Sequence, residues 1–125
     1  MRRIALVAMM VVLTASRVAI AQQPTTDFSK GNGLLKVCTS DRNVDSDICF
    51  GYIIGAADGL DLMNDQVKKK CNRRRSFCYP SGVAFGQIND VVINYLKANP
   101  DKRQDDSALL VEMALNQAWP CSEPE

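Results

Sequence analysis

The feature that most constrains this chain is a set of five cysteines behind an apolar leader. Residues 4–13 form an unbroken apolar run after two arginines, and Ala19 and Ala21 place small residues where signal peptidase reads them. The run is too short to span a bilayer, so the pattern predicts a cleaved signal peptide over residues 1–21. The remaining domain, residues 22–125, should then fold outside the cytoplasm, in an oxidising compartment where cysteines form disulfides.

With 21 of the 125 residues removed, 104 remain, which suits one domain with a modest core that disulfides can stabilise. Its charge is unevenly distributed. Six of its 12 basic residues lie between Lys68 and Arg75, and the rest of the domain carries six basic against 14 acidic residues, a net charge of −8. A basic segment therefore sits on an acidic body.

The hydrophobic spacing predicts an all-α fold of about four helices, because apolar residues recur every three or four positions and no strand pattern appears. The last two helices, joined by a short connection, should form an antiparallel hairpin. We expect a short helix from Phe28 to Cys38, followed by a second helix that is capped by Ser46 or Asp47 and runs to about Val67. An irregular basic connection over Lys68–Pro80 leads to a third helix over Ala84–Ala98, which ends at Asn99 and Pro100. A fourth helix is capped by Asp105 or Asp106 and runs through Trp119.

Three glycines stand four residues apart on the second predicted helix, at Gly51, Gly55 and Gly59. Each costs about 1 kcal/mol relative to alanine in a helix interior, so a compensating contact is expected. We interpret them as a flat strip against which another helix of the domain packs closely. The alternative is that the strip is the seam of a dimer.

Helix geometry favours two disulfide pairings. The start of the third helix and the end of the fourth lie together in an antiparallel hairpin, so a Cys78–Cys121 bond would clamp its open end. Cys38 and Cys49 flank the turn between the first two helices and form the second predicted pair. Cys71 is left over, and it either stays buried and inert, cross-links two chains, or competes with Cys121 for Cys78.

The residues for common catalytic chemistry are missing. The chain contains no histidine and no Cys-x-x-Cys motif, which disfavours a nucleophile–base pair, a histidine metal site and a thiol oxidoreductase. Asp58, Asp61 and Asp65 share one face of the second helix, as a cation site would, but a solvated acidic surface is the interpretation we prefer. We expect a protein that is not an enzyme and that has no metal and no cofactor.

The basic segment is the strongest surface signal. For an exported protein its ligands would be anionic head groups, polysaccharide phosphates or an acidic protein face, and nucleic acid is a poor candidate. A solvated loop without a partner is the other interpretation of such a run. We predict that the segment contributes to partner binding through Lys68, Lys69, Lys70, Arg73, Arg74 and Arg75.

Several motifs, taken in order, resemble the Tai/Rap immunity proteins. These are the run from Cys49 to Asp58, the segment Cys78-Tyr-Pro-Ser-Gly-Val83, Gly86-Gln87 followed by Tyr95-Leu96, and Trp119-Pro-Cys121. The resemblance implies an exported helical homodimer that inhibits a peptidoglycan amidase delivered by type VI secretion. It also implies that Cys38, Cys49, Cys78 and Cys121 occupy the family's cysteine positions, while Cys71 is extra.

Two features depart from that family pattern. The family usually has threonine where this chain has Ala84, and that threonine completes a capping box with the residue at Gln87. The basic segment is also denser than is usual. Our leading hypothesis is a non-catalytic immunity protein. The alternative is a periplasmic stress or envelope-associated module, such as a small chaperone, that uses the basic segment on anionic surfaces.

Overall fold

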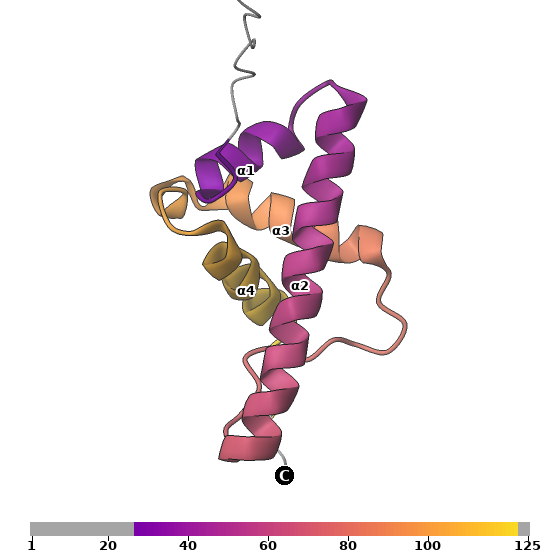
Figure 1. The fold of residues 1–125 in the computed structure, drawn as a ribbon, viewed down its shortest axis with the longest axis vertical. Helices are drawn as coiled ribbons and strands as arrows, with labels where there is room; N and C mark the ends of the chain where they lie inside the picture. The colour runs from indigo at the N-terminus through magenta and orange to yellow at the C-terminus, as the bar shows by residue number, and fades with distance from the viewer. Residues whose placement is uncertain (1–26, 123–125) are drawn as a thin grey trace, which may run out of the picture.

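The computed structural model describes residues 27–122, and the predicted leader lies outside them. Figure 1 shows an all-α domain in which one long helix runs along the whole length of the molecule, with the other helices packed against it. In chain order the elements are α1 (Gly31–Cys38), α2 (Asn43–Cys71), α3 (Phe85–Ala98), the short 3-10 helix η1 (Pro100–Lys102) and α4 (Ser107–Ala118). The predicted helical fold is confirmed. Across residues 27–122, every helix is too short or too polar to cross a membrane.

Helix α2 is longer than predicted at both ends. It begins at Asn43 rather than near Ser46, because Arg42 reaches across the first turn and donates two hydrogen bonds of 2.8 Å to the buried Asp45 carboxylate. It ends at Cys71 rather than near Val67. The positive charges of the three lysines at positions 68–70 interact favourably with the negative end of the helix dipole. Asn72 adopts the left-handed backbone conformation that is typical of the residue after a helix.

Helix α1 packs closely on the end of the hairpin. A side chain at Gly31 would lie 2.3 Å from the Leu110 side chain and 3.1 Å from the Arg103 backbone, so only glycine fits. Asp106 occupies the N-cap position of α4 as expected, but its carboxylate pairs with Lys30 at 2.6 Å instead of capping the helix. Glycine weakens a helix locally, and both Gly31 and Gly33 lie in the first turn of α1, so packing against the rest of the domain holds this helix in place.

The helices enclose one core between α2 and the other three. Helix α3 and helix α4 pack together as the predicted hairpin, and Arg103 in the connection donates hydrogen bonds to the carbonyls of Leu96 and Lys97 at the end of α3. This satisfies acceptors that a helix end leaves open. The largest side chains with less than 2% exposure are Phe77, Leu34, Ile53, Leu96, Leu110 and Leu115.

Both predicted disulfides are present. Cys38 bonds to Cys49, which joins the end of α1 to α2, and Cys78 bonds to Cys121, which clamps the open end of the hairpin. Cys71 is free at the last residue of α2, and it is exposed, so the alternative that it is buried is wrong. The alternative Cys71–Cys78 loop is therefore not formed.

The glycine strip does not contact another helix of the described domain, so that interpretation is wrong. A methyl group built at Gly51, Gly55 or Gly59 would meet no atom within 4 Å. The buried residues of α2 are Asp45, Cys49, Ile53 and Ala57, spaced four apart on another side of the helix. The three glycines face outward, and nothing within residues 27–122 covers them.

Candidate functional site

The basic segment lines a groove next to the Cys78–Cys121 disulfide. The groove has a volume of about 680 Å³ and runs between the end of α2 and the end of α4. We call it the basic groove. Its lining residues are Lys68, Asn72, Arg73, Arg74, Arg75, Ser76 and Cys78 on one side and Asn116, Pro120, Cys121 and Ser122 on the other.

An apolar anchor fixes the segment that carries the arginines. Phe77 is fully buried, although it follows four polar or charged residues in the sequence. Its ring packs edge-on against the Tyr79 ring with 5.1 Å between the ring centroids, and Tyr79 packs in the same way against Trp119 with a centroid distance of 5.6 Å. The Cys78 amide also donates to the Trp119 carbonyl at 2.9 Å. The segment therefore lies against the end of α4 as an ordered chain.

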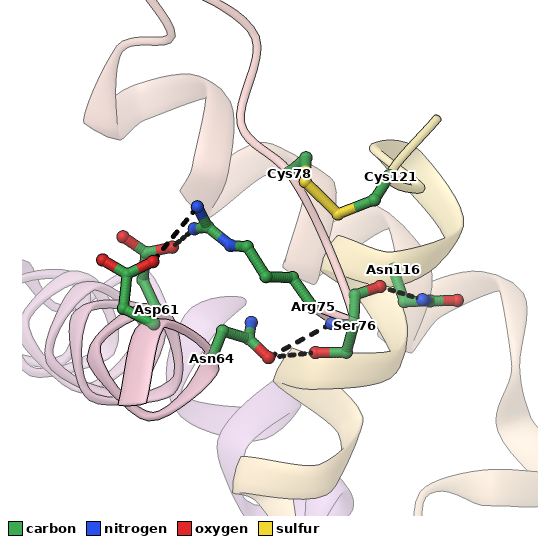
Figure 2. Close-up of a disulfide and its surroundings, with 8 residues drawn as sticks. Asp61, Asn64, Arg75, Ser76, Cys78, Asn116 and Cys121 are labelled. Carbon is green, nitrogen blue, oxygen red and sulfur yellow. Dashed lines mark hydrogen bonds and ion pairs between the residues drawn. A yellow bond between two sulfur atoms is a disulfide. The ribbon is translucent and has the colours of Figure 1, made fainter. Parts of the chain in front are cut away.

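Ser76 joins this segment to two helices at once. Asn64 on α2 accepts hydrogen bonds from the Ser76 amide at 3.1 Å and from its hydroxyl at 3.0 Å. Asn116 on α4 donates to the Ser76 carbonyl, as Figure 2 shows. Every backbone and side-chain polar group of Ser76 thus has a partner, and this serine is one of the residues that line the basic groove.

Arg75 points toward α2 and forms ion pairs there (Figure 2). Its guanidinium pairs with Asp61 and lies 3.2 Å from the Asp65 carboxylate, and the Arg75 side chain is only 24% exposed. The predicted solvated acidic surface is therefore only partly present: Asp58 is exposed, whereas Asp61 and Asp65 are part-exposed and form ion pairs with Arg75. They neutralise an arginine that the sequence alone placed with the binding cations.

The six predicted binding residues fall into different environments. Lys68, Arg73 and Arg74 line the basic groove and are exposed. Lys69 and Lys70 are also exposed but lie on other sides of α2, since successive helical residues differ by about 100°. Arg75 borders the groove but is neutralised by α2. The geometry gathers only part of the predicted set into one concave surface.

The exposed charged side chains that line the basic groove are all positive. Desolvation, together with the nearby Asp61 and Asp58 carboxylates, raises the pKa of Tyr79 to about 12, so this hydroxyl stays protonated at neutral pH. Residues 27–122 contain no group of three or more metal-ligating side chains placed to hold a metal ion. What the basic groove offers is fixed positive charge from side chains on an ordered frame.

Sequence reasoning missed the residues that build this frame. Asn64, Ser76 and Asn116 are polar side chains that follow no motif, and their roles depend on three segments meeting in space. Phe77 had a local signal, because phenylalanine is among the residues most often buried and here it follows a run of charged residues.

Comparison with known protein families gives one match. The sequence profile of the Rap1a immunity proteins matches residues 30–121, which include all four helices, both disulfides and nearly all of the basic groove. A search of curated proteins found no matching relative.

Proposed function

Because the chain belongs to the Rap1a immunity protein family, we propose that it is an exported, non-catalytic inhibitor of a peptidoglycan amidase delivered by type VI secretion. In this proposal the protein acts in the periplasm and blocks the active site of the effector before the cell wall is cleaved. The family match over residues 30–121 is the observation that carries the proposal, and the match itself concerns immunity proteins without naming the effector.

Export is supported by two independent features. The leader over residues 1–21 has the three-part pattern of a signal peptide. Both disulfides lie within the described domain, and such bonds form and persist mainly in oxidising compartments. The domain from residue 22 onward is then the form that meets an effector arriving in the periplasm.

We propose the basic groove as part of the contact surface. An inhibitor needs no catalytic group, only a surface that fits the partner. A preformed surface binds more tightly because it loses little conformational entropy on binding. Lys68 is carried by a helix, and Arg73 precedes a segment fixed by Phe77 and Ser76. An acidic rim around the amidase active site would complement these cations.

The test is a binding assay between the processed, disulfide-bonded protein and amidases encoded beside its gene. The variant Lys68→Ala with Arg73→Ala should weaken binding by about tenfold and flatten its salt dependence, because charged contacts are screened by salt. Lys36→Ala with Lys97→Ala is the matched control, since it removes two exposed positive charges elsewhere. Its affinity should stay near wild type.

Two results would count against the proposal. Equal binding by both double variants would show that the basic groove is not part of the contact surface, and it would leave the proposed immunity function untouched. If no neighbouring amidase bound the wild-type protein, but vesicles with anionic lipids did, the envelope-associated alternative would replace inhibition.

A further inference from the structure

The basic segment combines neighbouring arginines with little packing. Every residue from Lys68 to Arg74 is exposed, and residues 72–75 lie outside any helix. Figure 1 shows the end of α2 extending past α4 before the chain turns back. Proteases cut folded proteins at exposed, irregular segments, because a protease must hold several residues in an extended conformation. The basic segment therefore meets the first requirement of a cleavage site.

The last turn of α2 can open without disturbing the core. All four of its residues, from Lys68 to Cys71, are exposed, so unwinding them removes no core side chain from its packing. It breaks only backbone hydrogen bonds, such as the 3.2 Å bond that the Asn72 amide donates to the Lys68 carbonyl. Local opening precedes most cleavage of folded proteins, and its free-energy cost is lowest where buried apolar contacts are few. A protease can therefore bind the residues on both sides of Arg73 at small cost.

Of the three arginines, Arg73 and Arg74 are the pair that a protease can reach. Both are exposed, whereas the Arg75 side chain is only 24% exposed and pairs with Asp61 and Asp65. A protease that cuts at basic residues takes the side chain into a pocket that holds a carboxylate, as trypsin does. Arg75 already has carboxylate partners on α2 and would have to leave them. The Arg73–Arg74 bond lies between two exposed arginines, so it is the favoured bond.

The basic residues elsewhere in residues 27–122 are poorer cleavage sites. A cut beside them first requires a packed helix or a hydrogen-bonded loop to open, which costs more free energy than opening the end of α2. They lie in helices or at helix boundaries, and they are Lys30, Lys36, Arg42, Lys97, Lys102 and Arg103.

Neither disulfide would hold the two products of such a cut together. Cys38–Cys49 lies entirely before the Arg73–Arg74 bond, and Cys78–Cys121 lies entirely after it. One cut therefore separates α1 and α2 from α3 and α4, and only the packing between these pairs of helices then joins the two halves. A single hydrolysis thus weakens the whole fold, which is what inactivation by proteolysis requires.

We propose that the Arg73–Arg74 bond is a cleavage site for an endoprotease that recognises paired arginines through acidic pockets on both sides of the bond. Water is the other reactant. Its oxygen bonds to the Arg73 carbonyl carbon, the carbon–nitrogen bond breaks, and the two protons of the water pass to the released nitrogen. The products are an Arg73 carboxylate and an Arg74 ammonium group. Cleavage inactivates the domain and needs no effector, so it can be tested apart from the proposed function.

The first test is limited trypsin digestion of the processed, disulfide-bonded protein, followed by mass spectrometry under denaturing conditions without reductant. The earliest cut should follow Arg73 or Arg74 and should give two separate masses. Cutting after residue 73 divides residues 22–125 into halves of equal length, so masses and not gel mobility must identify them. Trypsin reads the one basic residue before the bond, so Arg74→Gln should still be cut after Arg73 near the wild-type rate.

The second test uses the envelope fraction of the bacterium that encodes the protein. This fraction should cut the wild-type protein and generate a new amino terminus at Arg74. In Arg74→Gln the same cut should slow by about tenfold, because the protease loses one charged contact. The matched control is Lys36→Gln, which replaces another exposed basic residue on α1. The control should be cut like wild type.

Three results would overturn the proposal. They are a first tryptic cut outside the Arg73–Arg74 pair, a wild-type protein that the envelope fraction leaves intact, and equal cleavage of wild type and Arg74→Gln by that fraction. Cleavage that needs Arg74 in the envelope fraction, but not with trypsin, supports it, since only a protease that reads the pair responds to the second arginine.

Discussion

Arg75 is the cation of the basic segment whose removal should reduce folding stability. Its guanidinium lies between Asp61 and Asp65, and the three side chains are 24%, 34% and 43% exposed. Exposed ion pairs contribute about 0.2–1 kcal/mol each, and partial burial moves these two toward the upper end. Removing the arginine also leaves two carboxylates one helical turn apart, which repel by a few tenths of a kcal/mol. Arg75→Ala should therefore lower the free energy of unfolding by about 1–2 kcal/mol.

The assay is denaturant and thermal unfolding with both disulfides intact. For a domain of this size, such a loss lowers the melting temperature by about 5–10 °C. The control is Arg73→Ala, since Arg73 is exposed and its loss should change stability by less than about 0.5 kcal/mol. A double-mutant cycle of Arg75→Ala with Asp61→Asn should give a coupling energy of about 0.5–1 kcal/mol. Equal stabilities for the two arginine variants, or a coupling energy of zero, would refute the ion-pair reasoning.

Three further predictions concern stability. Replacing Cys78 and Cys121 together by alanine should lower the free energy of unfolding by about 4 kcal/mol in the chain-entropy estimate, because the bond closes a loop of 43 residues. Chemical denaturation measures this loss, and a loss below about 1 kcal/mol would contradict the prediction. Ala84→Thr should add about 1 kcal/mol, since Gln87 already accepts the residue-84 amide at 2.9 Å and threonine would complete the capping box; an unchanged melting temperature would contradict it. The Tyr79 pKa of about 12 lies above the unfolded value near 10, so its stabilising contribution is present below pH 10 and is lost as the pH rises through 12. Tyr79→Phe should remove the phenol with the highest pKa from the titration followed by ultraviolet absorbance. A wild-type titration that is complete by pH 11 (about one unit above the pKa of an ordinary phenol) would contradict the raised pKa of Tyr79.

The capping site of α3 shows why family likeness and local structure must be considered together. This chain has alanine at position 84 where the family usually has threonine, so one half of the capping box is missing. The structure keeps Gln87 in half of the capping box, with its side-chain oxygen accepting the Ala84 amide. A glutamine three residues into a helix needs only backbone geometry for this bond, so its role survives the change at Ala84.

The ends of α2 show the limit of reading helix boundaries from hydrophobic spacing. The apolar periodicity located the middle of the helix, because burial dictates which positions must be apolar. It did not locate the ends. These depend on the Arg42–Asp45 contact and on three lysines beside the helix C-terminus, which are polar interactions with no periodic signature.

The sequence by itself determined the helical class and the order of the helices, and it favoured both disulfide pairings over the Cys71–Cys78 alternative that the structure excludes. Periodic burial identifies a helix within one segment, and an antiparallel hairpin brings its two ends together wherever it packs. Only the tertiary structure decided which charges are available for binding and which glycines are covered. Arg75 looks like its neighbours until Asp61 and Asp65 are seen beside it, and Gly55 looks like a packing site until its surroundings prove open. Both depend on which residues from distant parts of the chain come within a few ångströms, and that is set by the packing of whole helices.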